Sequence, residues 1–227
     1  MPPPPATSTP SRAACILFDF NGVLVDDEGF HFRGFLEVFA PLGARFSRAT
    51  YNARYLALDD LSAARAITRD FGLRTGVTEL VARKRAAYIR LCGPSFGMKR
   101  GVVEMVRRLH GNGVQFGIVS GAARAEIEAV LRRARLRRLF HVVIAAEDVR
   151  RCKPSPEGYR RALRLMGAAA RTTLAIEDSP GGIAAALAAR LKVIGIATSY
   201  PAAVLRRAGA ARVVRSLDRM RPEALVI

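Results

Sequence analysis

No apolar segment of this 227-residue chain approaches the roughly 20 residues that a membrane-spanning helix needs, so we expect no membrane span. The proline-, serine- and threonine-rich residues 1–12 lack the apolar stretch of a secretory signal, and we expect them to form a disordered tail. Cysteine is scarce, because Cys15, Cys92 and Cys152 are an odd number without metal-ligand spacing. These absences favour a reduced, cytoplasmic protein.

Lysine is also scarce: four of the 37 basic residues are lysines, the rest are arginines, and the formal net charge is +18. The arginines are spread along nearly every expected helix and do not gather into a run with interleaved aromatic residues, as they do in many nucleic-acid-binding surfaces. We therefore expect no specific nucleic-acid partner. A positive surface of this kind attracts small phosphorylated molecules by long-range steering.

Half of the residues are hydrophobic, and many of them occur in six short continuous runs. Such runs are typical of strands buried on both faces of a parallel sheet. Apolar residues recur at helical spacing between the runs, as Tyr159, Ala162 and Met166 do. This alternation predicts an α/β fold with a doubly wound parallel sheet. The six expected strands lie within residues 13–20, 115–121, 141–148, 172–179, 192–198 and 211–217.

The connection between the first two expected strands is much longer than one crossover helix requires. Residues 28–93 have the pattern of an almost wholly helical segment, with an apolar stripe that includes Phe32 and Phe39. An insert after the first strand lies over the carboxyl edge of the sheet, where open α/β folds bind ligands. We therefore predict a smaller α-helical cap domain over residues 28–93 and an α/β core domain made of residues 13–27 and 94–227.

Polar residues stand where four of the expected strands end. Each alone has a structural explanation, such as a turn, a helix cap or a surface lysine. Together they would meet at one edge of the sheet and combine a carboxylate nucleophile, an anion-binding hydroxyl, a cation and two adjacent carboxylates whose repulsion a metal ion relieves. That set fits phosphoryl transfer through an aspartyl-phosphate. In chain order the residues are Asp19, Ser120 with Gly121, Lys153, and Glu177 with Asp178.

The segments FDFNGVLVD, IVSG, KPSPEGY and AIEDSPGGIAAALAA resemble, in this order, the four motifs of the haloacid dehalogenase superfamily. The set is most similar to the helical-cap subfamily that includes β-phosphoglucomutase-like and phosphoglycolate-phosphatase-like proteins. The resemblance covers essentially residues 13–217. It implies a Rossmann-like core, Mg²⁺ as the cofactor and a small phosphorylated metabolite as the substrate. We expect a monomer or a weak dimer.

The resemblance implies a nucleophile and a metal site. Asp19 would attack phosphorus and also bind Mg²⁺. The other protein ligands would be the backbone carbonyl of Asn21 and the carboxylates of Glu177 and Asp178.

The resemblance also implies substrate contacts. Ser120 and Gly121 would hold phosphate oxygens, and Lys153 would neutralise charge on the nucleophile and the phosphate. His31 would face the active site, the alternative being a solvated residue in the first turn of a cap helix. Arg54 would reach a substrate anion, the alternative being an ordinary exposed arginine.

One position departs from the family pattern. The usual first motif is D-x-D, and its second aspartate donates and accepts the protons of the reaction, whereas this chain has Asn21 there. An amide can orient a water or a leaving oxygen, but it does not exchange a proton at neutral pH. General acid/base catalysis contributes about 10²–10⁴-fold. We therefore expect a slow phosphatase whose dephosphorylation step is impaired, and we expect Asn21→Asp to raise turnover.

The site residues and Lys84 also help to distinguish a phosphatase from other activities of this superfamily. A mutase needs the acid/base residue twice per cycle, which disfavours that activity here. A dehalogenase needs no metal, so the pair Glu177 and Asp178 argues against one. A phosphonoacetaldehyde hydrolase uses an early cap lysine, whereas Lys84, late in the expected cap, is the only lysine there. A catalytically weak binding protein that engages nucleic acid through its basic surface stays open as the alternative function.

Overall fold

The computed structural model describes residues 14–56, 58–93 and 97–218, so the expected tail over residues 1–12 lies outside the described residues. The core is one six-stranded sheet in which all strand pairs are parallel and the order is β3-β2-β1-β4-β5-β6. Each of the six expected runs corresponds to one strand, with β3 beginning one residue before its run, and the predicted fold class is confirmed. The strands are β1 (Cys15–Phe18), β2 (Gln115–Val119), β3 (Phe140–Ile144), β4 (Thr173–Glu177), β5 (Lys192–Ile196) and β6 (Arg212–Val214).

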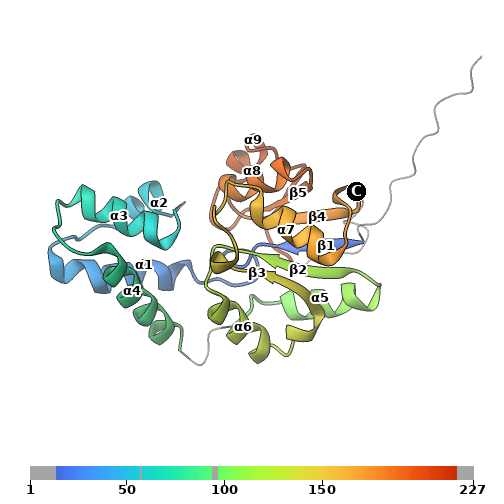
Figure 1. The fold of residues 1–227 in the computed structure, drawn as a ribbon, viewed down its shortest axis with the longest axis horizontal. Helices are drawn as coiled ribbons and strands as arrows, with labels where there is room; N and C mark the ends of the chain where they lie inside the picture. Colours follow the sequence, from blue (N-terminus) through green and yellow to red (C-terminus); the bar gives the residue numbers. More distant parts are fainter. Residues whose placement is uncertain (1–13, 57, 94–96, 219–227) are drawn as a thin grey trace, which may run out of the picture.

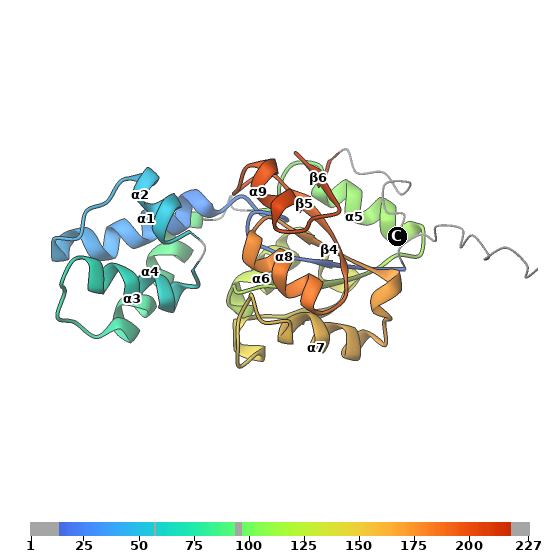
Figure 2. The ribbon, with the colours of Figure 1, turned by 90° about the horizontal axis from the view of Figure 1, so that it is seen from above.

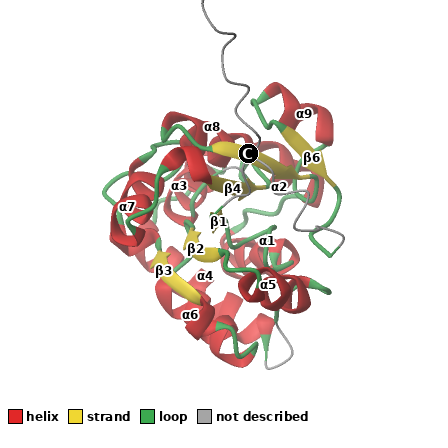
Figure 3. Cartoon of the chain, turned by 90° about the vertical axis from the view of Figure 1, so that its right-hand side faces the viewer, coloured by secondary structure: helices red, strands yellow, loops and turns green. Residues whose placement is uncertain are grey.

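Helices cover both faces of this sheet (Figure 3). One face packs against α5 (Val102–Gly111) and α6 (Arg124–Arg133). The other packs against α7 (Glu157–Met166), α8 (Pro180–Ala188) and α9 (Ala202–Arg207). Short 3₁₀ turns complete the connections: η1 (Ala40–Leu42), η2 (Arg137–Leu139), η3 (Ala146–Asp148) and η4 (Ala170–Thr172).

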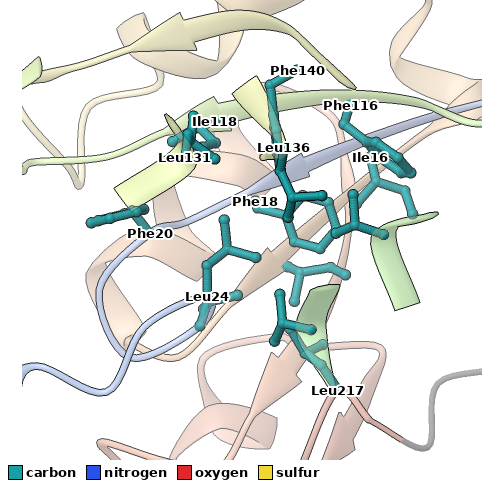
Figure 4. Packing of buried hydrophobic residues seen from close by; sticks show 14 of the residues in the cluster. Ile16, Phe18, Phe20, Leu24, Phe116, Ile118, Leu131, Leu136, Phe140 and Leu217 are labelled. Atoms are coloured by element: carbon teal, nitrogen blue, oxygen red, sulfur yellow. The ribbon is translucent and has the colours of Figure 1, made fainter. Parts of the chain in front are cut away.

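The central strand β1 is buried on both faces because its side chains alternate between the two helical layers. Ile16 and Phe18 belong to the apolar cluster beneath α5 and α6, whereas Cys15 and Leu17 belong to the cluster beneath α7 and α8. Figure 4 shows the first cluster, in which the rings of Phe18 and Phe116 lie 5.8 Å apart. A strand buried on both faces needs a continuous apolar run, and this is why the run was visible in the sequence.

The expected cap segment forms four helices: α1 (Glu28–Phe39), α2 (Arg48–Arg54), α3 (Asp60–Asp70) and α4 (Val77–Cys92). They make a lobe beside the end of the sheet at which β1 leads into α1, and we call it the cap lobe (Figures 1 and 2). The lobe has an apolar cluster of its own, in which Phe35, Tyr51 and Ile67 are buried. None of the described helices is long and apolar enough to cross a membrane.

The strand order explains where a ligand can bind. β1 pairs with β2 on one side and with β4 on the other, so the chain winds away from β1 in both directions. Connections that leave a strand on opposite sides open a crevice at its carboxyl end, where α/β proteins bind ligands. Asp19 directly follows β1 and therefore stands at that crevice.

Candidate active site

Asp19 and Lys153 form the floor of the site. The backbone of Asp19 continues the pairing of β1 with β4, because its N–H donates to the carbonyl of Ile176 at 2.9 Å. Lys153 Nζ donates to Asp19 Oδ1 at 2.7 Å and contacts Glu177 Oε1 at 2.6 Å. Burial alone would lower the pKa of Lys153, but the charges of Asp19 and Glu177 outweigh it and raise that pKa. Lys153 is therefore a cation in the free protein.

Asp19, Glu177 and Asp178 bring three buried carboxylates together, with one oxygen of each within 4.8 Å of the others. Burial is the main cause that raises the pKa of Glu177 to about 7, and burial with the charge of Asp19 raises the pKa of Asp178 well above its ordinary value. Glu177 Oε2 is buried and has no hydrogen-bond partner among the described residues. Among the described residues Lys153 is the lysine in direct contact with these carboxylates, and its one charge does not balance three acids, so their oxygens fit a hard divalent cation.

Two glycines allow these carboxylates to sit where they do. A Cβ on Gly22, whose φ is +68°, would lie 1.8 Å from Asp178 Oδ2. A Cβ on Gly182, in the first turn of α8, would lie 1.9 Å from Glu177 Oε2. Ser199 donates a short hydrogen bond to the same atom, Asp178 Oδ2. The loop after β1 and the start of α8 therefore approach the carboxylates closely.

The end of β2 supplies a hydroxyl on the other side of Asp19. Ser120 is buried, and its Oγ accepts a hydrogen bond from the N–H of Ala122 at 3.1 Å. The same Oγ lies 3.3 Å from Asn21 Oδ1 and can donate to it. Gly121 is exposed and lines the cleft with Ser120. A hydroxyl and an open backbone at the end of a strand can hold an anionic oxygen.

Asp27, at the start of α1, lies behind Asn21 and is completely buried. Its Oδ2 accepts hydrogen bonds from Asn21 Nδ2 at a short distance and from the Tyr88 hydroxyl at 2.8 Å, and His31 Nε2 lies 3.1 Å away. Burial would raise the pKa of Asp27, but the contacts with His31, Tyr88 and Asn21 outweigh it and lower that pKa. Asp27 is therefore a buried carboxylate that carries a negative charge at neutral pH.

Lys84 completes this network from α4. Its Nζ lies 2.5 Å from His31 Nδ1 and 2.6 Å from Asp60 Oδ1, and its side chain is 1% exposed. An ammonium can only donate, so His31 Nδ1 accepts and Nε2 carries the proton that is shared with Asp27. The network thus ties α1, α3 and α4 of the cap lobe to the loop that follows β1.

The cleft between the cap lobe and the core has a volume of about 270 Å³. Most of the residues expected at the site line it, and Glu177 and Asp178 lie just beneath. Arg54 does not line the cleft: its side chain is 57% exposed and pairs with Asp70 at 2.8 Å. The predicted contact of Arg54 with a substrate anion is therefore dropped. Expected residues along the cleft are Asp19, Asn21, His31, Ser120, Gly121 and Lys153.

Sequence reasoning missed two residues of the site. Asp27 stands just before a helix, where an aspartate is an ordinary N-cap residue, yet its side chain caps no N–H of α1. Lys84 did carry a signal, because it falls between Leu80 and Tyr88 on the buried face of α4. A lysine at the helical spacing of a buried face needs a partner, and that pattern could have indicated the ion pair.

Comparisons with known proteins agree with this geometry. The family model described as haloacid dehalogenase-like hydrolase matches residues 13–190. Hexitol phosphatase B of Escherichia coli is 31% identical over 192 residues, which are 82% of this chain and 85% of the relative. Protein CbbY of Rhodobacter capsulatus is 28% identical over 194 residues, covering 82% of this chain and 86% of the relative.

A solved structure is similar over the whole described fold. It is a variant of CbbY from Rhodobacter sphaeroides in complex with xylulose-(1,5)bisphosphate, with a TM-score of 0.78 and 26% identity, covering 95% of this chain and 100% of that one. The fold and the site define an α/β enzyme with a carboxylate cluster at the carboxyl edge of its sheet and a helical cap lobe. The chain belongs to the haloacid dehalogenase-like hydrolases.

Proposed function

We propose that this protein is a Mg²⁺-dependent phosphatase that acts on a small phosphorylated metabolite through an aspartyl-phosphate on Asp19. The observation that carries the proposal is the pair of contacts from Lys153 to Asp19 and Glu177 at the end of β1, beside Asp178. A nucleophilic carboxylate, a fixed cation and a hard-metal site at one point are what phosphoryl transfer requires. The relatives described above, hexitol phosphatase B among them, support a phosphate ester as the substrate.

In the first step an Asp19 oxygen forms a bond to phosphorus while the bond from phosphorus to the leaving oxygen breaks. Lys153 lies against Asp19 Oδ1 and offsets the negative charge that gathers there. The Ser120 hydroxyl and the backbone at Gly121 hold phosphate oxygens on the opposite side. The leaving oxygen must take its proton from solvent water, because the Asn21 amide cannot supply one.

In the second step water attacks the phosphorus of the aspartyl-phosphate, and the bond from phosphorus to the Asp19 oxygen breaks. The products are inorganic phosphate and the free carboxylate. Asn21 lines the cleft and can accept a hydrogen bond from the water, but it cannot remove the proton. We therefore expect this step to limit turnover.

Asp19, Glu177, Asp178 and the backbone carbonyl of Asn21 would hold the Mg²⁺ ion. Bound there, Mg²⁺ would neutralise phosphoryl oxygens and the three carboxylates. The fit rests on the buried cluster and on the unpartnered Oε2 of Glu177. Three unpaired cysteines are consistent with a reducing, cytoplasmic setting, which we also propose.

The walls of the cleft suggest a leaving group rich in hydroxyls. Three acidic residues, Glu28, Asp60 and Glu126, line the cleft. Arg85 also lines it, but its positive charge faces the Asp60 carboxylate at 4.0 Å. Burial raises the pKa of both Glu28 and Glu126. A carboxyl group accepts a hydrogen bond from a hydroxyl, and in its protonated form it can also donate one. A second phosphate group on the substrate would instead lie close to several acidic side chains. A small polyol monophosphate suits these walls.

The test is a screen of phosphate monoesters and acyl phosphates with and without Mg²⁺. We expect activity that is lost in excess chelator and lost in Asp19→Asn, because that variant removes the nucleophile. Asp26→Asn is the matched control, since Asp26 is exposed and seven residues further along the same segment. Undiminished hydrolysis by Asp19→Asn would contradict the proposal.

A further inference from the structure

Asn21 and Asp27 form one complementary pair. A carboxylate has no hydrogen to donate, so the Asn21 atom that faces Asp27 Oδ2 must be Nδ2. Asn21 Oδ1 then points the other way, toward the Ser120 hydroxyl at 3.3 Å. Asp27 is 0% exposed and is itself held by Tyr88 and His31, so it cannot turn aside. The orientation of the amide in the cleft is therefore decided by a residue that lies outside the cleft.

We infer that Asp27 is a positioning residue for the reaction proposed above: its buried carboxylate holds the amide of Asn21 so that Oδ1 faces the position of the attacking water. This inference rests on the proposed phosphatase function. Asn21 lines the cleft and Asp27 does not. The acceptor oxygen of Asn21 therefore faces the cleft, while the negative charge of Asp27 stays buried behind it. Asp27 acts through Asn21 and does not touch the substrate.

The pairing changes what Asn21→Asp should do. In that variant a carboxylate oxygen replaces Nδ2 and faces Asp27 Oδ2, so a hydrogen bond becomes a contact between two negative charges, one of them fully buried. The substitution that restores an acid/base residue in the sequence therefore conflicts with the structure. We expect Asn21→Asp alone to gain much less turnover than the sequence suggests.

Exchanging both residues preserves the pairing. In Asn21→Asp with Asp27→Asn, the amide nitrogen of residue 27 donates to the carboxylate of residue 21. His31 Nε2, which lies 3.3 Å from Asn21 Nδ2, can donate to the carboxylate that replaces it. The Tyr88 hydroxyl both donates and accepts, so it can accept from the new amide. The exchanged protein keeps the same net charge and brings the carboxylate into the cleft.

The first experiment measures the thermal midpoint of four proteins: the natural chain, each single variant and the exchanged variant. Asn21→Asp should lower the midpoint by roughly 5–10 °C, because it places a second carboxylate against the buried charge of Asp27. The exchanged variant should recover most of that loss. Midpoint shifts of the two single variants that simply add in the exchanged protein would overturn the pairing.

The second experiment observes the Asn21 amide directly. The chain has three asparagines, at positions 21, 52 and 112, so a sample labelled with ¹⁵N-asparagine gives three side-chain NH₂ pairs in an NMR spectrum. The Asn21 pair, identified by its loss in Asn21→Asp, should shift and exchange faster in Asp27→Ala. It should stay in place in Asp26→Ala, the matched control with an exposed side chain. An Asn21 signal that Asp27→Ala leaves unmoved would overturn the inference.

The third experiment follows the phosphoenzyme after a single loading with acetyl phosphate and Mg²⁺. Asp27→Asn should load, yet lose phosphate about tenfold more slowly than the natural chain, because its Asn21 amide is free to turn. The exchanged variant should lose phosphate at least tenfold faster than the natural chain, since the new carboxylate at position 21 can take the proton. Equal rates of loss in Asn21→Asp and the exchanged variant would contradict the inference. If none of the proteins loads, the proposed function fails, and the melting and NMR experiments still decide the pairing.

Discussion

At the scale of single residues, the geometry of the carboxylate cluster depends on the presence or absence of individual atoms. Gly22 and Gly182 have no Cβ, and each leaves room for a carboxylate oxygen that would otherwise overlap it. Lys153 holds two of the three acids, and Ser199 holds the third. The geometry of the carboxylate cluster therefore depends on the two glycines as much as on the side chains that hold the acids.

Gly182→Ala tests this close approach. The new Cβ would lie 1.9 Å from Glu177 Oε2, and Glu177 is buried and held by Lys153 and Tyr159, so it cannot move freely. We expect a loss of about 1–3 kcal/mol in the free energy of unfolding and weaker Mg²⁺ binding. Gly181→Ala is the matched control, because its Cβ would meet nothing within 4 Å. Denaturant titration of both variants should separate them, and equal stability would contradict the packing argument.

The cap lobe is held together at the scale of the elements by an ion pair inside an otherwise apolar interface. Lys84 of α4 reaches Asp60 of α3 and His31 of α1, and its Nζ lies 4.9 Å from the centre of the Phe35 ring. Because Asp27 shares His31 with Lys84, the same contacts reach the loop that carries Asn21. The packing of the lobe and the arrangement of the cleft are thus linked.

Lys84→Met should test that link. Removing the ammonium takes one partner from Asp60 and one from His31, and Asp60 is 23% exposed, which lets solvent offset part of the cost. We expect a loss of about 1–3 kcal/mol in the free energy of unfolding and a lower kcat on any substrate that the protein accepts. Arg83→Met is the control, because Arg83 is an exposed neighbour on the same helix. A Lys84→Met protein as stable as the Arg83→Met protein would show that the pair does not stabilise the lobe.

At the scale of the whole molecule, we expect the carboxylate cluster to make stability depend on pH and on bound metal. In the metal-free protein the raised pKa of Glu177, about 7, means that the folded state holds a proton that the unfolded chain releases at its ordinary pKa of 4.5. Between those two values the folded state binds more protons, so stability falls as pH rises. A divalent cation takes the place of the proton and removes this loss.

We therefore expect saturating MgCl₂ to raise the thermal midpoint more at about pH 8 than at about pH 5. Asp178→Asn should reduce the shift at the higher pH, because it removes one of the three carboxylates. The measurement is a set of thermal scans with and without MgCl₂ at both pH values. A shift of the same size at both pH values would argue against a carboxylate site that must release protons to bind the metal.

The net charge of +18 is a property of the whole chain and not of one surface element. Dispersed arginines bind polyanions weakly, and their affinity falls steeply between about 50 and 200 mM salt. We expect single-stranded and duplex oligonucleotides to bind without sequence preference and to be released across this range. Fluorescence anisotropy titrations measure this, and tight, sequence-dependent binding at the higher salt would favour the nucleic-acid-binding alternative.

Much of the fold could be predicted from the sequence, because buried parallel strands and the helices that cover them require local patterns of apolar residues. Six continuous apolar runs correspond to six strands, and helices α1 to α4 occupy the segment 28–93 that was expected to be helical. Buried strands and amphipathic helices each require apolar residues at regular positions, and that pattern is visible in the sequence. The residues at the ends of β1, β2 and β4 could be predicted to converge, because parallel strands end at one edge. The sequence by itself thus determined the fold class, the position of the cap segment, and the meeting of Asp19, Ser120, Lys153, Glu177 and Asp178.

Only the tertiary structure decided which residues that are far apart in the sequence contact one another. Lys84 and His31 are 53 residues apart, Asp27 and Tyr88 are 61 apart, and no periodicity joins such pairs. Arg54 could reach a substrate on paper, but the orientation of α2 turns it to Asp70. Asp27 precedes α1 at an ordinary N-cap position, yet the fold buries its side chain against Asn21. A hydrogen bond depends on two atoms being within about 3 Å, and that distance is set by the packing of whole elements.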